Sequence, residues 1–274
     1  MDAQATKVAA FHALHDRPGV FVMPNAWDAG SAKLLARLGF EALATTSAGL
    51  AYALGKPDGE ATRAESLGNA RALAEAVELP VSADLENGFG HEPAACAETI
   101  RLAAAAGVVG GSIEDATGDP ADPIYPFALA VERVAAAVRA ARSLPFPFVL
   151  TARAENLIHG RQDLPDTLRR LEAYAAAGAD VLFAPGLRGR DQIAAVVRAV
   201  APKPVSVIMA LGAGTLSVED LGALGVKRIS VGSSLARAAY GAFLRAAEEI
   251  RKGGTFAYAD LAVPYAEMNE RLKT

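Results

Sequence analysis

The stretch LPVSADLENGFG, residues 79–90, sets the pattern on which the fold prediction depends. A short apolar run ends in two acids, Asp84 and Glu86, and an amide, Asn87, before glycines break it. A strand buried on both faces of a parallel sheet produces this kind of short apolar run. Carboxylates are costly to bury without a partner, so the acids predict the end of the strand and a ligand held there.

The same plan recurs along the whole chain. Eight short apolar runs occupy residues 20–24, 42–47, 80–86, 109–115, 148–155, 181–185, 204–209 and 228–232. Helical patterns follow them at residues 29–38, 63–77, 92–106, 127–141, 164–177, 191–199, 218–224 and 235–251. Eight strand–helix units predict an α/β fold of the (β/α)8 TIM barrel type. An open doubly wound sheet is disfavoured, because PNAWD after the first run lacks a glycine-rich phosphate loop.

Segments at both ends flank the predicted barrel. Residues 3–15 predict a leading helix, and residues 255–274 form a partly apolar C-terminal tail. We expect one domain over residues 1–274, because no change in composition marks a linker. The apolar tail residues need burial either against a neighbouring subunit or against the chain's own barrel.

Composition excludes several classes of protein. Hydrophobic residues make up 52% of the 274 residues and charged residues 21%, which is typical of a globular protein. A net charge of −4 without a basic run argues against nucleic-acid partners and against anionic membranes. Cys96 is the single cysteine, so an intrachain disulfide is impossible. Without an apolar signal-like start or a membrane-length apolar run, we expect a cytoplasmic protein.

Polar residues gather where the strands are predicted to end, and barrel active sites lie at that end. Acids follow the third and fourth runs, and an arginine follows the fifth; the set comprises Asp84, Glu86, Asn87, Glu114, Asp115, Arg153 and Glu155. Several carboxylates without lysine partners predict a hard divalent cation, Mg²⁺ with Mn²⁺ as the alternative. A buried ion pair between Asp84 and Arg153 would account for one acid only.

Four ordered motifs make a specific resemblance. The segments FVMPNAWDAGSAKLLARLGFEALATTSAGLAYALGKPDG, VSADLENGFG, GGSIED and TARAEN resemble the isocitrate lyase/phosphoenolpyruvate mutase superfamily, in register over residues 18–160. The last strand and helix, ISVGSSLARAA, also fit. The resemblance implies a barrel whose last helix is exchanged between subunits, and hence a homodimer or homotetramer.

The resemblance also implies roles for individual residues. It implies that Asp84 and Glu114 bind Mg²⁺ and that Asp58 holds a metal-bound water. Arg153 corresponds to the arginine that faces the substrate's oxygens. The amides of the turn that grips a substrate carboxylate correspond to Thr46, Ser47, Ala48 and Gly49. We count Asn87 as a further substrate-binding candidate, and Arg153, Asp58 and Glu155 as the catalytic candidates.

Two departures from the family pattern limit what can be transferred. Ser82 stands where the family has the first acid of its metal pair. The loop at residues 117–126, where the family has its gating loop, lacks both the cysteine of the isocitrate-cleaving relatives and the lysine and asparagine of the mutases. Cys96, on a predicted helix, is expected to pack in the core.

These residues predict lyase chemistry on a small dicarboxylate or phosphonate oxo acid. We expect cleavage of a C–C or P–C bond through an enolate, and oxaloacetate-like decarboxylation suits the missing cysteine. The proton donor is left open; the candidates are Glu155, His91, Tyr52 and Tyr125. His91 and His159 are expected to be solvated loop residues, and Thr117 a turn residue.

The sequence supports other functions less well. A Schiff-base aldolase needs a lysine at a strand's carboxyl end, which Lys56, Lys203 and Lys227 do not provide. The sequence Gly232-Ser233-Ser234 allows a phosphate site but favours a helix cap. A phosphonopyruvate-type hydrolase or mutase, or a non-catalytic metabolite-binding relative, remains an alternative.

Overall fold

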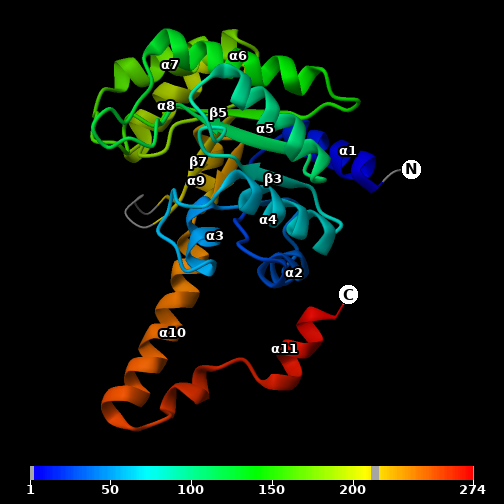
Figure 1. The fold of residues 1–274 in the computed structure, drawn as a ribbon, viewed down its shortest axis with the longest axis vertical. Helices are drawn as coiled ribbons and strands as arrows, with labels where there is room; N and C mark the ends of the chain where they lie inside the picture. Colours follow the sequence, from blue (N-terminus) through cyan, green and yellow to red (C-terminus); the bar gives the residue numbers. More distant parts are fainter. Residues whose placement is uncertain (1–2, 211–215, 274) are drawn as a thin grey trace.

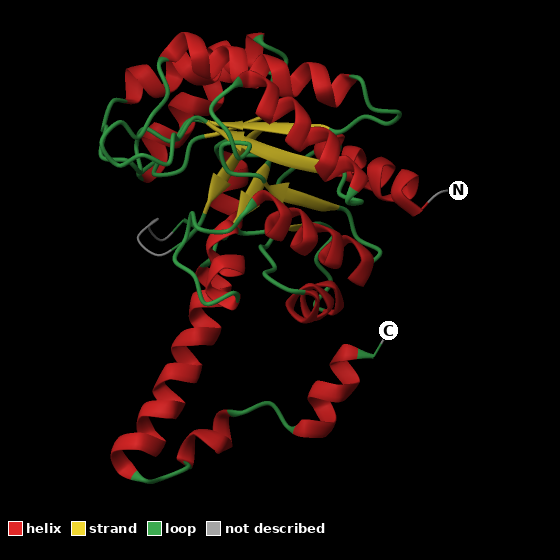
Figure 2. Cartoon of the chain, in the orientation of Figure 1, coloured by secondary structure: helices red, strands yellow, loops and turns green. Residues whose placement is uncertain are grey.

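The computed structural model describes residues 3–210 and 216–273, and a ring of parallel strands lies at its centre (Figure 2). The strands are β1 (Phe21–Val22), β2 (Leu43–Ala44), β3 (Val81–Asp84), β4 (Gly110–Glu114), β5 (Val149–Arg153), β6 (Val181–Phe183), β7 (Val205–Ile208) and β8 (Arg228–Ser230). The predicted (β/α)8 architecture is confirmed. The predicted single domain over residues 1–274 stays a prediction, and its extreme ends lie outside the described residues.

The ring closes between its first and second strands. The eight-stranded sheet runs in the order β1-β8-β7-β6-β5-β4-β3-β2. A parallel bridge between Asn25 and Ala44 then joins the two edges, and the Ala26 amide donates to the Ala44 carbonyl at 2.8 Å. Because parallel strands all end on the same side of such a ring, their polar terminal residues converge there.

Helices follow the strands, and all except the projecting α10 pack around the ring (Figure 1). They are α2 (Ala29–Arg37), α3 (Ser47–Ala53), α4 (Arg63–Ala76), α5 (Pro93–Ala105), α6 (Phe127–Arg142), α7 (Leu164–Ala176), α8 (Gly189–Val200), α9 (Val218–Ala223) and α10 (Ser234–Gly253). The sequence set the start of α4 locally, because Thr62 and Glu65 form a reciprocal capping box. Helix α3 was not predicted, and it begins at Ser47, which is the last residue of the strand predicted at residues 42–47.

The predicted leading helix is present as α1 (Ala3–Asp16), and it closes the end of the barrel at which the strands begin. Phe11 is fully buried and packs in a separate apolar cluster with Val109 and Val149, which lie at the beginnings of β4 and β5. Gly110 makes this contact feasible, because a Cβ atom there would lie only 2.8 Å from the Phe11 ring. The amino ends of the strands are therefore sealed by packing, which leaves the carboxyl ends for chemistry.

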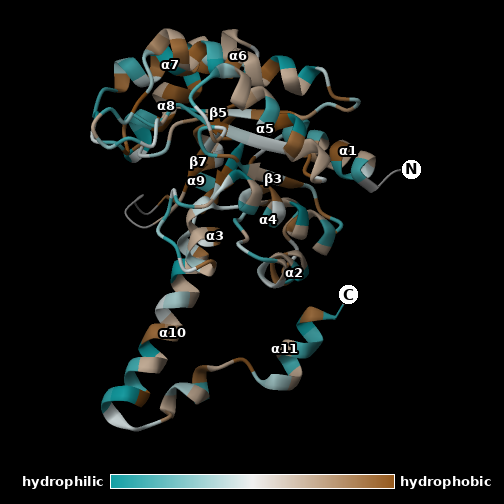
Figure 3. Cartoon of the chain, viewed as in Figure 1, coloured by the Kyte–Doolittle hydropathy of each residue, from teal (hydrophilic) through white to brown (hydrophobic). Residues whose placement is uncertain are grey.

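The C-terminal part of the chain leaves the barrel as an arm. Helix α10 projects away from the body, and the chain returns through a 3-10 turn (Ala257–Leu261) to α11 (Tyr265–Leu272) near α2 (Figure 1). Arg37 on α2 donates to the Lys273 carbonyl at 2.7 Å. Hydrophobic residues lie along this arm (Figure 3), and Leu261 is 91% exposed. The tail touches its own barrel at one end while most of its apolar surface is uncovered.

Candidate active site

A cleft of about 1050 Å³ opens at the carboxyl ends of β3, β4 and β5. Six of the predicted site residues line it: Asp58, Asn87, Glu114, Arg153, Glu155 and Ser47. Glu86 lines it as well, whereas Asp84 lies below it and lines a smaller cavity inside the barrel. The strand-end residues are therefore brought together at one mouth, as the strand pattern indicates.

Arg153 is the centre of the charge arrangement. Its Nη1 lies 2.9 Å from Asp84 Oδ1 and its Nη2 lies 3.1 Å from Glu114 Oε2. Its Nε lies 2.9 Å from Glu155 Oε1. Burial alone would lower the pKa of Arg153, but the three carboxylates raise it well above its usual value. The expectation that an arginine ion pair would account for only one acid is wrong, because one guanidinium contacts three.

The amides after β2 face the same acids. Thr46 caps α3, and the Ser47 amide donates to Asp84 Oδ2 at 3.3 Å. Gly49 is required at this turn, since a Cβ atom there would lie 2.6 Å from Thr46 Cγ2. Ala48 is buried in the same first turn. The predicted carboxylate-gripping segment is thus the beginning of a short helix, and its Ser47 amide points at an acid of the site.

The chain after β3 is strained where it enters the cleft. Glu86 and Phe89 have positive φ angles of 47° and 58°, a backbone conformation that residues other than glycine seldom adopt. The Glu86 carbonyl accepts from the Glu114 amide at 3.0 Å, which fixes this conformation. Asn87 bridges two loops: its Nδ2 donates to the Thr117 carbonyl at 3.2 Å and its Oδ1 accepts from the Phe89 amide.

Negative charge is left over in this cluster. Burial, together with Asp84 and Asp58, raises the pKa of Glu86 to about 7. The buried Glu86 Oε1 has no hydrogen-bond partner. Burial also raises the pKa of Glu114 well above its usual value, although Arg153 opposes that shift. Five acids, Asp58, Asp84, Glu86, Glu114 and Glu155, gather around Arg153, so carboxylates outnumber positive charges in this cluster.

The donor set fits Mg²⁺. Among residues 3–210 and 216–273, no three acid, histidine or cysteine side chains form a complete metal-ligand cluster. Mg²⁺ does not need one, because it retains several waters and is commonly held by one or two carboxylates. The unpartnered Glu86 oxygen and the raised pKa values are what a missing cation would leave behind. Asp84 and Glu114 would hold the ion, with Asp58 reaching it through water.

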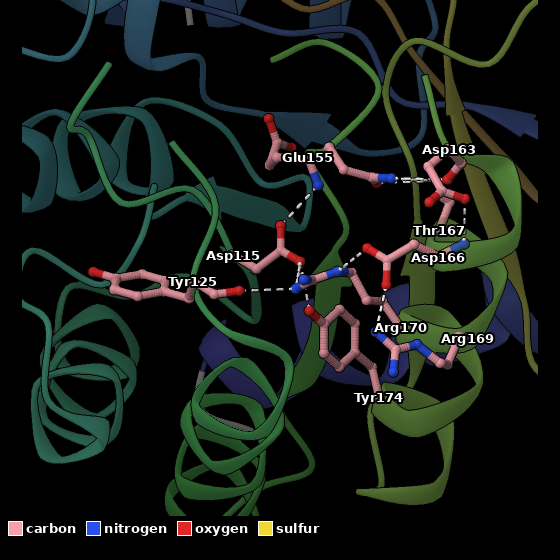
Figure 4. Close-up of polar contacts among 10 residues, drawn as sticks. Asp115, Tyr125, Glu155, Asp163, Asp166, Thr167, Arg169, Arg170 and Tyr174 are labelled. Carbon is pink, nitrogen blue, oxygen red and sulfur yellow. Dashed lines mark hydrogen bonds and ion pairs between the residues drawn. The ribbon is translucent and has the colours of Figure 1, made fainter. Parts of the chain in front are cut away.

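Asp115 belongs to a different network, although it was grouped with the acid cluster. Its Oδ2 accepts from Tyr174 at 2.6 Å and from Arg170 at 3.1 Å, and its Oδ1 accepts from the Glu155 amide at 2.8 Å (Figure 4). The side chain is buried behind the sheet against α7. Alternation along β4 explains this placement, since successive side chains point to opposite faces. Asp115 therefore holds the end of β5 in place.

The predicted gating loop, residues 117–126, is closed at its base. Ala116 and Ile124 form an antiparallel bridge, and the Thr117 hydroxyl donates to the Asp122 carbonyl at 2.6 Å. Thr117 is thus a turn residue, as expected. Asp122 also pairs with Arg161 at 3.2 Å, which connects the exposed tip to the loop after β5.

One pairing at the cleft was not predicted. His91 Nδ1 lies 2.8 Å from the Tyr125 hydroxyl, and His91 lines the cleft. His91 is an exposed loop residue, as expected, and this hydrogen bond to Tyr125 is the part that was not predicted. Arg133, fully buried on α6, lies 4.1 Å from the Tyr125 ring centroid and donates to the carbonyls of Asn87, Gly90 and His91. The sequence signal for these contacts was Arg133, a charged residue within the apolar pattern of residues 127–141.

His159 also lines the cleft and is exposed, as expected for a loop histidine. Burial lowers its pKa, so the neutral form dominates at pH 7. Tyr52, another proton-donor candidate, makes an edge contact with Tyr240 on α10. Neither residue makes a described hydrogen bond to the acid cluster.

The rival sites are occupied by structural contacts. Lys56 pairs with Glu65 at 2.6 Å, and Lys227 donates to the Gly19 carbonyl at the start of β8. The expected cap at residues 232–234 is present, since Ser233 is the N-cap residue of α10, but its hydroxyl makes no capping hydrogen bond. The amides of residues 231 and 232 instead donate to Asn25 Oδ1, each at 2.9 Å. Cys96 is buried in the core, as predicted.

No helix in the described ranges, residues 3–210 and 216–273, is both long and apolar enough to cross a membrane.

Residues 11–251 match the family model described as phosphoenolpyruvate phosphomutase. An uncharacterized protein of Mycobacterium tuberculosis is 36% identical over 265 residues, covering 96% of each chain. An oxaloacetate decarboxylase of a Bradyrhizobium species is 30% identical, covering 76% of this chain and 71% of the relative.

Solved structures agree with these relatives. A Burkholderia cenocepacia protein, solved as a candidate lyase/mutase, is 60% identical and covers 100% of this chain and 98% of its own, with a TM-score of 0.97. Oxaloacetate acetylhydrolase with the product oxalate superposes with a TM-score of 0.88 at 28% identity, covering 98% and 94% of the two chains. The prediction of an enzyme with lyase-like chemistry is confirmed at this level, and the chain belongs to the isocitrate lyase/phosphoenolpyruvate mutase superfamily.

Proposed function

We propose that the protein is a Mg²⁺-dependent lyase that breaks a C–C bond beside the carbonyl of a small oxo acid. One observation carries the proposal: Asp84 and Glu114, at the ends of adjacent strands, share Arg153 beneath a cleft with surplus negative charge. When bound, Mg²⁺ would supply a Lewis acid for the oxo and carboxyl oxygens of the substrate. Manganese offers the same chemistry and is the alternative ion.

The protein's own residues would bind and orient the substrate. Arg153 presents a planar guanidinium that suits a carboxylate or a developing oxyanion. The Ser47 amide, at the cleft wall, would turn from Asp84 to the substrate's carboxyl end and fix its orientation. Asn87, at the cleft wall, would offer a further polar contact. A dicarboxylate with an oxo group, such as oxaloacetate, matches this pair of anion-binding elements.

Decarboxylation is the reaction we favour for this cleft. The bond to the departing carboxylate breaks, CO₂ leaves, and the electron pair moves to the carbonyl oxygen to give an enolate near Arg153. A proton is needed only after that step, so the missing loop cysteine is no obstacle. His91, which contacts Tyr125 and lines the cleft, would deliver that proton. Glu155 would keep the Arg153 guanidinium in place.

A substrate panel tests the proposal. Oxaloacetate, phosphonopyruvate and a methylisocitrate-type acid are each incubated with the full chain in Mg²⁺ or in EDTA, and product is followed by chromatography. We expect turnover of oxaloacetate that requires the metal. Turnover of phosphonopyruvate alone would support the hydrolase or mutase alternative, and tight binding without turnover would support a metabolite-binding relative.

The acid-to-amide variant Asp84→Asn tests the metal assignment, and Asp16→Asn is its control. Asp84→Asn should abolish turnover, whereas Asp16→Asn, at the sealed end of the barrel, should leave turnover unchanged. Full activity in Asp84→Asn would refute the metal assignment.

We also propose that the arm mediates self-association into a homodimer or homotetramer. Leu261 and Tyr265 are 91% and 86% exposed, and Phe243 and Leu244 on α10 are exposed as well. So much uncovered apolar surface on one segment is costly in water. Sedimentation of the full chain, compared with the variant Leu244→Glu, should show a larger species that the substitution reduces.

A further inference from the structure

The interior of the barrel holds an arginine that has no carboxylate partner. Arg228 is the first residue of β8 and is 3% exposed. Its Nε donates to Ser206 at 3.1 Å and its Nη2 donates to Thr151 at 2.8 Å. Its Nη1 is buried and has no hydrogen-bond partner. Among the described residues, the ion pairs do not include Arg228, so two neutral hydroxyls are its only side-chain partners.

The charge of Arg228 is maintained despite this isolation. Burial lowers the pKa of Arg228 to about 9, so the guanidinium is still largely protonated at pH 7. No neighbouring acid opposes that shift. Buried charges in proteins are otherwise paired or bound to an ion, and an uncompensated one is strongly unfavourable.

A cavity adjoins this arginine. It has a volume of about 80 Å³, and its wall includes Arg228 and the hydroxyl side chains Ser82, Ser112, Ser206 and Ser230. Barrel interiors are normally filled by bulky branched side chains, so a polar hollow of this size is unusual. One water takes up about 30 Å³ of liquid, which leaves room here for a small ion and a water.

The size of the cavity limits what can occupy it. Asp84 and Arg153 also line it and form an ion pair at 2.9 Å, and Arg153 lines the cleft as well. A single-atom anion fits a volume of this size, and serine hydroxyls can rotate to donate to it.

We propose that this cavity, which we call the Arg228 cavity, binds a monovalent halide of the size of chloride. The anion would take the unused donor of Arg228 and compensate its charge. Four serine hydroxyls surround the same space and supply further donors. The inference does not rest on the proposed lyase activity, because it needs neither Mg²⁺ nor substrate, although Asp84 and Arg153 of the candidate active site also line this cavity.

Water is the rival occupant. His15 Nδ1 lies 2.8 Å from the Phe11 carbonyl, which places the proton on Nδ1 and leaves Nε2 as an acceptor. Nε2 is buried without a partner, and the charge of Arg228 contributes to lowering the pKa of His15 to about 3. A water between His15 Nε2 and Arg228 Nη1 would satisfy both atoms but would leave the charge uncompensated.

Thermal unfolding in different sodium salts separates the two occupants. The full chain is heated in chloride, in bromide and in gluconate at equal ionic strength, without Mg²⁺ or substrate; gluconate is too large for the cavity. We expect both halides to raise the Tm by about 5 °C at saturation relative to gluconate. The variant Arg228→Met should lose this difference, whereas Arg17→Met, which removes an exposed arginine, should keep it.

Crystals soaked in sodium bromide provide a second measurement that needs no variant. The anomalous signal of bromide should give a peak in the Arg228 cavity, within hydrogen-bonding reach of the guanidinium. Equal Tm values in halide and gluconate, or bromide peaks confined to the surface, would overturn the proposal. A water peak between His15 and Arg228 in bromide-soaked crystals, with an otherwise empty cavity, would do the same.

Discussion

Glu114 and Asp115 are consecutive residues at the end of β4, yet their surroundings are opposite. Glu114 points into the barrel mouth, where Arg153 is shared with Asp84 and Glu155. Asp115 points outward, where Arg170, Tyr174 and a backbone amide supply three donors to its two oxygens (Figure 4). The outward network is saturated with donors, whereas the inward cluster lacks positive charge.

The difference separates stability from function. A buried carboxylate with a complete set of donors fixes the local structure, and breaking such a network is costly. A cluster of acids with raised pKa values is maintained against its own repulsion, which is typical of a site that binds a cation. Substitutions on the two sides should therefore have opposite consequences.

The largest expected effect is on catalysis, in the variant Glu114→Gln. Loss of a metal-holding carboxylate should reduce kcat/KM for oxaloacetate by about 10³, which corresponds to about 4 kcal/mol. The free energy of unfolding should be unchanged or higher at pH 8, because burial raises the pKa of Glu114 and the amide carries no charge. Steady-state kinetics and urea unfolding measure the two quantities. A variant that lost stability and kept its rate would reverse the assignment of the two sides.

The next effect is on stability, in the variant Asp115→Asn. Arg170 would lose its buried counter-ion, and the free energy of unfolding should fall by about 3 kcal/mol. Arg170 keeps its bond to Asp166 at 2.7 Å, which limits the loss. The matched control is Asp166→Asn, which breaks partly exposed pairs and should cost about 1 kcal/mol or less. Equal losses in the two variants would mean that the outward network is not the structural one.

The sequence was sufficient to predict the fold, because the alternation of a short apolar strand with a helical pattern repeats eight times along the chain. It also placed Asp84, Glu114 and Arg153 at one mouth, since parallel strands must end together. The strand pattern alone could not tell Glu114 from Asp115, because which of two adjacent acids faces inward depends on the exact strand register; the family resemblance was what assigned the metal to Glu114. The partners of Asp115 and of His91 lie 34 to 59 residues away along the chain, beyond any local pattern.

Arg228 was missed for a related reason. It is the first residue of the predicted strand at residues 228–232, where a charged residue usually marks an exposed start. Ring closure and alternation instead turn it inward, together with Ser230, while Ile229 packs in the outer core. Only the closed barrel, with its register of β7 and β8, reveals that the side chain is enclosed.

The smallest expected effect is on the pH dependence of the unfolding free energy, in the variant Glu86→Gln of the inward cluster. Burial and the nearby Asp84 and Asp58 raise the pKa of Glu86 from 4.5 to about 7, so folding favours its neutral form. This stabilisation is complete below pH 4.5 and is lost as the pH rises through 7. Because the residue is only partly buried, we expect the loss to be about 2 kcal/mol between pH 5 and pH 8 in EDTA.

The Gln variant cannot ionise at this position, so its unfolding free energy should fall less over the same interval and exceed that of the wild type at pH 8. Glu78→Gln, an exposed acid before β3, is the control and should follow the wild type. Saturating Mg²⁺ should lower the pKa of Glu86 and shrink the difference between wild type and Glu86→Gln. If urea unfolding gives the same pH slope for both proteins in EDTA, the inward cluster carries no surplus charge, and the contrast between Glu114 and Asp115 has another cause.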